Sequence, residues 1–122
     1  LAGEFPCRTL DCPRPDRARW RYPAQLARAV ARARRSLREL EAAAVVGLGS
    51  YASIPASLAA RSLGIPLYLM ECNAVPGKAT RLLSRFAQGI GLGNRQAAPF
   101  LVSIENRRIL ALIHLRPDGR HV

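Results

Sequence analysis

The sequence predicts an α/β fold with a parallel sheet, and three observations lead to that prediction. Apolar residues recur at helical spacing over residues 23–40. Two short apolar runs, AAAVVG at 42–47 and IPLYLM at 65–70, have the length and composition of buried strands. Helix-like segments follow both runs after short connections, which is the order typical of parallel strand–helix units. At 122 residues, the chain is the size of one domain with room for one core.

The first helix is predicted over residues 23–40, with Pro23 suited to its first turn. Its apolar stripe has spacings of 4, 3, 4 and 3 residues and consists of Leu26, Val30, Ala33, Leu37 and Leu40. Arg28, Arg32 and Arg35 lie off that stripe. Two interpretations of these arginines stay open: a solvated helix face, or a basic surface that contacts anionic lipid head groups.

A second helix is predicted over residues 55–63 (PASLAARSL), with Gly64 as its left-handed cap. A third is predicted over residues 78–87 (KATRLLSRFA), with Leu82, Leu83 and Phe86 on one face. These helices would connect the two predicted strands to each other and to the chain that follows.

The two ends of the chain give weaker patterns. Residues 1–22 are expected to form an irregular segment, residues 23–87 the folded domain, and residues 88–122 a tail without an assigned role. Within that tail, QGIGLGNRQAAP is predicted to be a loop. The tail also holds two candidate strands, FLVSI and RRILALIHL, which would be joined by a turn at Glu105 and Asn106.

The charge balance limits the partners of this chain. Lysine and arginine number 19 against 8 acidic residues, for a net charge of +11, which favours anionic partners such as phosphorylated ligands or anionic lipid. Nucleic acid is not expected, because only 6% of residues are aromatic and none alternates with the basic residues to form stacking platforms. No run approaches the ~20 apolar residues that span a bilayer, and the first residues do not resemble a signal peptide.

The three cysteines, Cys7, Cys12 and Cys72, are expected to be reduced thiols of a cytosolic protein. Their spacing fits neither a disulfide framework nor a zinc site, so no metal or cofactor is expected. The sequence does not begin with Met, so we expect it to be a fragment of a longer protein.

Two loops should lie at the ligand-binding edge of the predicted sheet, because ligands of open parallel sheets bind at the carboxyl ends of the strands. The first, GLGSYAS, contains Gly49, Ser50, Tyr51 and Ser53. Its glycines allow backbone N–H groups to approach a phosphate near a helix N-terminus. The alternative is a turn whose glycines only permit close packing.

The second loop, ECNAVPG, begins with Glu71, Cys72 and Asn73. A carboxylate just past a buried strand is costly unless it is paired or faces a cleft. Glu71 and Asn73 either line a ligand cleft or cap the next helix and bind loop backbone. Cys72 is not expected to be a nucleophile, because His114 and His121, the candidate bases, lie in the unassigned tail.

Taken together, VVGLGSYASIPASLAARSLGIPLYLMECNAVPGKATRLLSRFA resembles the N-terminal domain of the MurG-type glycosyltransferases. The agreement runs in order through a strand, G-x-G-x-Y-x-S-x-P, LAA-x-x-LGIP, a second strand, E-x-N-x-x-x-G and a helix, and covers roughly residues 20–87. Enzymes of this family transfer N-acetylglucosamine from UDP-N-acetylglucosamine to the undecaprenyl-diphosphate-linked muramoyl-pentapeptide precursor of peptidoglycan. The resemblance therefore implies part of a Rossmann-like domain of a GT-B fold, in an enzyme peripheral to the inner face of the bacterial plasma membrane.

The resemblance also implies roles for individual residues. The loop with Gly49, Ser50, Tyr51 and Ser53 corresponds to one that receives the acceptor diphosphate. Separately from the resemblance, the arginine-rich helix predicts attachment to an anionic membrane, with Arg28, Arg32 and Arg35 as its membrane-facing basic residues. Asn73 corresponds to a residue associated with the nucleotide-sugar donor, and Glu71 would line the same cleft.

Departures from the family pattern affect the expected activity. Ser50 replaces a glycine, and the usual H-E-Q-N reads Met70-Glu71-Cys72-Asn73. The family's first glycine loop, G-G-T-G-G-H, with the histidine favoured as general base, and its donor domain have no counterpart in the printed sequence. We therefore expect no catalytic residue in this chain and no turnover by it alone. The alternative function is a non-enzymatic α/β module that binds a phosphorylated or nucleic-acid ligand through its basic face.

Overall fold

The computed structural model describes residues 7–10, 12–14, 19–97 and 108–112 of the chain. Its helices and strands follow in the order α1 (Tyr22–Glu39), β1 (Val45–Gly47), α2 (Ile54–Leu63), β2 (Leu67–Glu71), α3 (Lys78–Leu83), β3 (Gly89–Leu92) and β4 (Arg108–Leu112). Short 3-10 turns cover Tyr51–Ser53 and Arg95–Ala97. The predicted alternation of helices and strands is confirmed.

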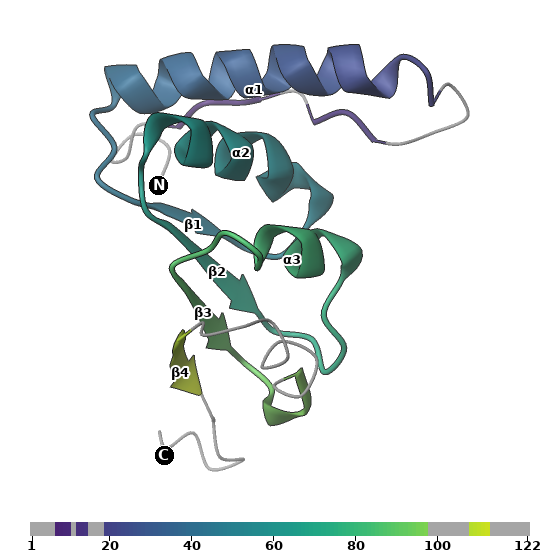
Figure 1. Cartoon of the computed structure of the whole chain (residues 1–122), viewed down its shortest axis with the longest axis vertical. Coiled ribbons are helices and arrows are strands. Elements are labelled where there is room, and N and C mark those ends of the chain that lie inside the picture. Colours follow the sequence, from purple (N-terminus) through teal and green to yellow (C-terminus); the bar gives the residue numbers. More distant parts are fainter. Residues whose placement is uncertain (1–6, 11, 15–18, 98–107, 113–122) are drawn as a thin grey trace.

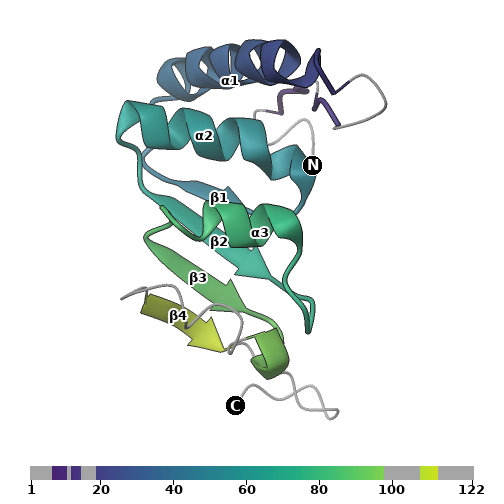
Figure 2. The same ribbon diagram turned by 45° about the vertical axis from the view of Figure 1, so that its right-hand side comes forward.

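The four strands form one parallel sheet in the order β1-β2-β3-β4. Val46 pairs with Tyr68, and Leu69 pairs with Ile90. Because consecutive strands are neighbours, each connecting helix lies beside the strands that it joins: α2 contacts β1 and β2, and α3 contacts β2 (Figure 1). The turned view shows the four strands one after another along the molecule (Figure 2). The predicted α/β fold with a parallel sheet and flanking helices is confirmed.

Helix α1 packs on α2 instead of on the sheet (Figures 1 and 2). Its buried residues are Ala29 and Ala33, whose small side chains let the two helices approach closely. The predicted stripe is therefore only partly right: Ala33 is buried, whereas Leu40 is 43% exposed at the end of the helix. The other three stripe residues, Leu26, Val30 and Leu37, are half-buried.

The core lies between the sheet and the two connecting helices. Leu67 and Leu69 of β2 and Leu83 of α3 are at most 2% exposed. The helix α3 ends at Leu83, before the predicted end, and its buried positions include Ala79 and Thr80. Leu82 and Leu83 are predicted to share one face, but Leu82 is 45% exposed whereas Leu83 is fully buried.

The prediction of a loop after residue 87 was wrong in part. Gly89–Leu92 forms β3, which is hydrogen-bonded between β2 and β4. The strand β4 falls inside the predicted strand RRILALIHL. The other candidate strand, FLVSI, and the turn at Glu105 and Asn106 lie outside the described residues. The left-handed cap at Gly64 is confirmed by its φ of 71°.

Candidate functional site

The loops that follow β1 and β2 lie against each other at one edge of the sheet. Gly49 of the first loop has a φ of +74°, in the left-handed region that favours glycine. A Cβ added there would lie 2.9 Å from Oγ1 of Thr80 and 3.4 Å from Oε2 of Glu71. Gly49 is therefore required both by its backbone conformation and by its close contact with the second loop. This contact agrees with the packing interpretation of the glycine turn, and it leaves ligand binding by the loop as a prediction.

Glu71 organises the second loop from its buried position at the end of β2, where it is 2% exposed. Its Oε1 accepts hydrogen bonds from the backbone N–H and the Nδ2 of Asn73, both at 2.9 Å. Its Oε2 accepts a 2.7 Å bond from the hydroxyl of Thr80 and a 3.4 Å bond from the N–H of Gly77, the residue before α3. These contacts correspond to the interpretation in which Glu71 binds loop backbone and the start of the next helix.

The same hydrogen bonds set the protonation state of Glu71. Burial opposes the charge of this carboxylate, but the bonds from Asn73, Thr80 and Gly77 together outweigh it, so the pKa of Glu71 is lowered from its ordinary value. A carboxylate that is ionised at neutral pH and engaged at both oxygens is a poor general base. Its chemistry at this site is to hold its neighbours in place.

Asn73 is exposed, but its side chain is fixed by the bond from Nδ2 to Glu71. The amide oxygen Oδ1 has no hydrogen-bond partner among the residues that the structure describes. It can accept a hydrogen bond from a hydroxyl or an N–H of a ligand.

The residues after Gly49 differ in how they present their side chains. Ser50 and Tyr51 are exposed, whereas the hydroxyl of Ser53 donates a 2.6 Å bond to the carbonyl of Ser50. Ser53 precedes α2 without capping it through its side chain. The hydroxyls of Ser50 and Tyr51 are thus the ones that this loop offers to a ligand.

A cavity of about 550 Å³ opens beside this loop. It is lined by Cys12, Arg14, Ser50, Tyr51 and Ala52. Its wall therefore includes residues of the N-terminal segment, which the sequence predicts to be irregular. No signal in the sequence pointed to Cys12 or Arg14, because their approach to the loop depends on the tertiary fold.

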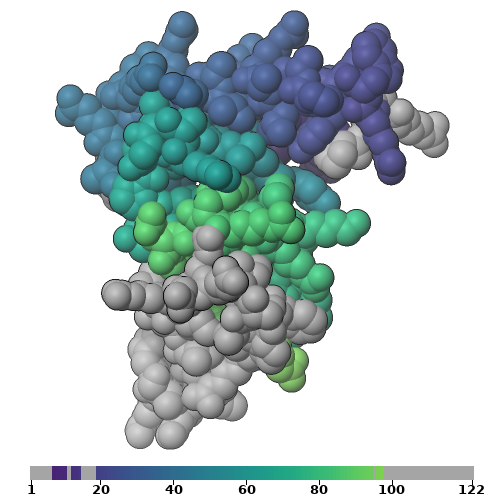
Figure 3. All heavy atoms as spheres, viewed as in Figure 1, coloured from purple at the N-terminus to yellow at the C-terminus, as the bar shows by residue number. Residues whose placement is uncertain are grey.

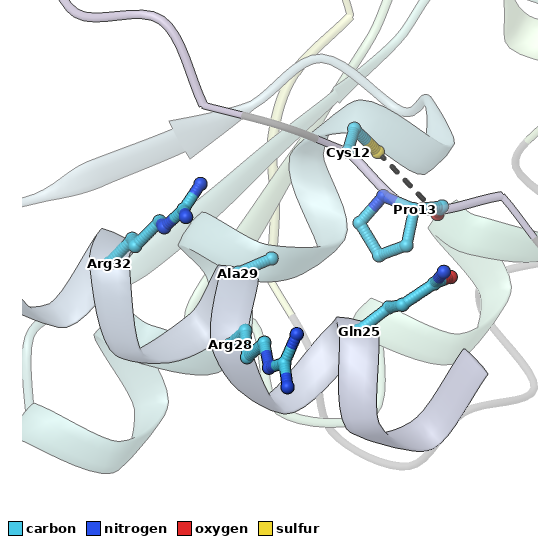
Figure 4. A pocket seen from close by; sticks show the side chains of 6 residues that line it. All are labelled: Cys12, Pro13, Gln25, Arg28, Ala29 and Arg32. Carbon is cyan, nitrogen blue, oxygen red and sulfur yellow. Dashed lines mark hydrogen bonds between the residues drawn. The ribbon is translucent and has the colours of Figure 1, made fainter. Parts of the chain in front are cut away.

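A second cavity, of about 300 Å³, lies between the N-terminal segment and α1. Arg28, Ala29 and Arg32 of α1 line it together with Cys12 and Pro13, as Figure 4 shows. Its remaining lining residue, Gln25, also belongs to α1. Arg35 lies farther along the same helix, in a groove that it shares with Arg8. The structure thus keeps the three predicted basic residues on α1, outside the cavity at the glycine loop.

Of the cysteine and histidine residues considered for catalysis, the structure describes Cys72. Cys72 is exposed, and its backbone lies close to Gly93, where an added Cβ would be 3.1 Å from the Cα of Cys72. His114 and His121 lie outside the described residues. Within the described ranges, no group of three His, Cys, Asp or Glu side chains is placed to hold a metal ion.

Comparisons with known proteins identify the family. The model of the glycosyltransferase family 28 N-terminal domain matches residues 8–92. A UDP-N-acetylglucosamine--N-acetylmuramyl-(pentapeptide) pyrophosphoryl-undecaprenol N-acetylglucosamine transferase of Rubrobacter xylanophilus is 56% identical over 64 residues, which are 52% of this chain and 19% of that protein. A protein of the same name from Synechococcus sp. is 47% identical over 81 residues, which are 66% of this chain and 22% of that protein.

A solved structure supports the same assignment. The crystal structure of Acinetobacter baumannii MurG matches with a TM-score of 0.64 and 32% identity, over 75% of this chain and 25% of that chain. The chain spans about a fifth of the length of the curated relatives it matches. Since the family model covers well over half of the sequence, this chain belongs to the glycosyltransferase family 28 N-terminal domain family.

Proposed function

We propose that this chain is the acceptor-side part of an enzyme that transfers N-acetylglucosamine from UDP-N-acetylglucosamine to the undecaprenyl-diphosphate-linked muramoyl-pentapeptide in peptidoglycan synthesis. The names of its relatives support this proposal. The observation that carries it is the cavity of about 550 Å³ beside the glycine loop, which Ser50 and Tyr51 line with exposed side chains. Family membership favours this function over a non-enzymatic binding module.

The proposed reaction is an inverting displacement. The muramoyl hydroxyl oxygen forms a bond to C1 of N-acetylglucosamine, the bond from C1 to the diphosphate of UDP breaks, and UDP leaves with the bonding electrons. A general base takes the proton of the attacking hydroxyl. Glu71 is unsuited to that role because its pKa is lowered and its oxygens are engaged.

Within this reaction, the loop with Gly49, Ser50 and Tyr51 binds the acceptor diphosphate, with Ser53 holding its turn. A helix N-terminus favours such an anion through its unpaired N–H groups and partial positive charge. Asn73 contacts the sugar donor, with its amide positioned by Glu71. The Oδ1 of Asn73, which has no partner among the described residues, can accept a hydrogen bond from a sugar hydroxyl. It cannot bind a phosphate oxygen in this way, because that oxygen and Oδ1 are both acceptors.

Binding of a soluble acceptor tests this proposal. A ¹⁵N NMR titration of the whole chain with a short-prenyl analogue of the diphosphoryl-muramoyl-pentapeptide should shift the amide signals of Ser50 and Tyr51. A titration that moves neither signal would contradict the acceptor role. Purified chain with labelled UDP-N-acetylglucosamine and acceptor should give no labelled product, and detectable transfer would contradict its assignment as an incomplete enzyme.

The proposed location is the cytoplasmic face of the plasma membrane, where the enzyme contacts anionic lipid through α1. Among the described residues, no helix has the length and apolar character needed to cross a bilayer. The side chains of α1 form one border of the molecule in the space-filling view (Figure 3). Arg28 and Arg35 are exposed on this helix, and Trp20, just before it, is 76% exposed.

Vesicle binding tests this location. The chain should co-sediment with phosphatidylglycerol vesicles and not with phosphatidylcholine vesicles, and about 0.5 M salt should weaken binding because it shortens the screening length. Arg28→Glu and Arg35→Glu, made one at a time, should each reduce the bound fraction more than Arg85→Glu, which makes the same charge change at an exposed position outside α1. Binding that resists both salt and the α1 substitutions would contradict an electrostatic contact.

A further inference from the structure

Two described residues of the N-terminal segment contact other parts of the chain: Arg8 contacts α1, and Cys12 contacts the glycine loop. Arg8 forms an ion pair with Glu39 at the end of α1. Farther along, the thiol of Cys12 donates a hydrogen bond to the carbonyl of Tyr51, with 3.2 Å between sulfur and oxygen. These contacts bring residues 12–14 to the same cavity as the loop.

Arg14 gives that cavity a positive charge. Among the described residues that line the cavity, none is acidic: the others are Cys12, Ser50, Tyr51 and Ala52. Arg14 is exposed, and no hydrogen bond or ion pair joins it to another described residue. Its guanidinium can therefore bind a ligand without breaking a contact with any residue that the structure describes.

The rest of the cavity wall also suits an anion. Ser50 and Tyr51 contribute exposed side chains with hydroxyl donors. The 3-10 turn Tyr51–Ser53 leads directly into α2, and no side chain caps the start of either element. The N–H groups of Ser53 and Ile54 are bound to the carbonyls of Ser50 and Tyr51, and Pro55 has none, so this end contributes the partial positive charge of the helix dipole. A volume of about 550 Å³ is large enough for a diphosphate group with its hydration.

We propose that Arg14 is an anion-contacting residue of this site and that its guanidinium binds a diphosphate group held over Ser50–Ala52. The inference deepens the proposed function and rests on it, since it takes the ligand to be the diphosphate of the acceptor. Arginine is suited to this contact because its planar guanidinium donates two parallel hydrogen bonds to phosphate oxygens. The N-terminal segment thereby becomes part of the acceptor site.

Titration of the ¹⁵N-labelled whole chain with pyrophosphate and with geranyl diphosphate tests the inference. Both probes should shift the amide signals of Ser50, Tyr51 and Ala52. Arg14→Gln should raise both dissociation constants about fivefold to tenfold, as expected for loss of a charge-assisted contact. Arg14→Lys should raise the dissociation constants less than Arg14→Gln, because lysine keeps the positive charge but cannot donate two parallel hydrogen bonds. The matched control is Arg85→Gln, which removes one positive charge from an exposed position beyond α3 and should change neither constant by more than about twofold.

The outcomes separate this inference from the proposed function. Equal weakening by Arg14→Gln and Arg85→Gln would overturn it, because only net charge would then matter. Weakening confined to geranyl diphosphate would also overturn it, since Arg14 would then contact the prenyl chain. If the probes shift Ser50–Ala52 equally in the wild type and in Arg14→Gln, the Arg14 contact fails while the acceptor loop stands. If they shift none of these signals in the wild type, the acceptor role of the loop fails as well. Unchanged circular dichroism and melting temperature of each variant establish that it is folded.

Discussion

The hydroxyl of Thr80 donates a 2.7 Å hydrogen bond to Oε2 of Glu71, and this contact joins α3 to the end of β2. The carbonyl of Gly49 lies 3.4 Å from the same hydroxyl. Because a hydroxyl has one proton, the shorter contact with the charged carboxylate takes it. Thr80 is therefore a positioning residue: it holds Glu71, which holds Asn73, and it packs against the glycine loop.

Replacing Thr80 with valine should destabilise the chain by about 1.5–3 kcal/mol, because it removes a hydrogen bond to a buried charged group while keeping the side-chain shape. The pKa of Glu71 should rise in this variant, since one of the bonds that lower it is lost. Urea unfolding measures the stability, and NMR titration of the Glu71 carboxyl measures the pKa.

The control is Thr80→Ser, which keeps the hydroxyl and loses one methyl group. It should cost about 0.8 kcal/mol and leave the pKa of Glu71 low. Equal effects of valine and serine on that pKa would show that the hydroxyl does not support the carboxylate.

Because the pKa of Glu71 is lowered in the folded chain, the free energy of unfolding should decrease at acidic pH. Its pKa is below the ordinary value of 4.5 in the folded chain, so its charged form is favoured by folding. The stabilisation is fully present above the unfolded-state pKa and is lost as the pH falls through the folded-state pKa. The free energy of unfolding should therefore change little through Glu71 from pH 8 to about 5.5 and fall below about pH 4.5.

Glu71→Gln should lower stability at pH 7 and remove part of the decline in acid. Glu41→Gln is the matched control, since Glu41 is an exposed carboxyl without a hydrogen-bond partner among the described residues. It should leave the acid decline as in the wild type. If the free energy of unfolding of Glu71→Gln falls in acid as steeply as that of the wild type, the decline comes from other carboxyl groups.

Local patterns in the sequence predicted much of the fold and the placement of the two loops. The stripe of residues 23–40 predicted α1, and Gly64 predicted the end of α2, because helical spacing and left-handed caps are local signals. Parallel topology placed Gly49 and Glu71 at one sheet edge, and their contact confirms that placement.

Features that depend on tertiary contacts were not predictable in this way. The strand Gly89–Leu92 contains two glycines in four residues, and its extended form depends on pairing with its neighbours. The Thr80 hydroxyl reaches Glu71 across nine positions of the chain, and Cys12 reaches Tyr51 across 39. Leu40 and Leu82 followed apolar patterns, yet they are exposed. Leu40 lies one residue beyond the end of α1, and α3 buries Ala79, Thr80 and Leu83 instead of Leu82.

Two glycines with similar backbones offer a matched test of the contact between the loops. Gly49→Ala and Gly64→Ala both place a Cβ at positive φ, +74° and +71°, which costs about 1–2 kcal/mol. At Gly64 the new methyl meets nothing within 4 Å, whereas at Gly49 it lies 2.9 Å from Oγ1 of Thr80. Gly49→Ala should therefore destabilise the chain by about 1–3 kcal/mol more than Gly64→Ala in urea unfolding. Equal losses would show that the loops do not depend on this close contact.

Ser57 of α2 carries a buried hydroxyl without a hydrogen-bond partner among the described residues. Ser57→Ala should stabilise the chain by up to about 1 kcal/mol, because it removes a polar group whose desolvation is not compensated. Ser84→Ala is the matched control, since Ser84 is equally buried but donates a 2.8 Å bond to the carbonyl of Arg81. That variant should cost about 0.5–1.5 kcal/mol. Thermal and urea unfolding measure both, and a loss for Ser57→Ala as large as that for Ser84→Ala would mean that the Ser57 hydroxyl has a partner in solution.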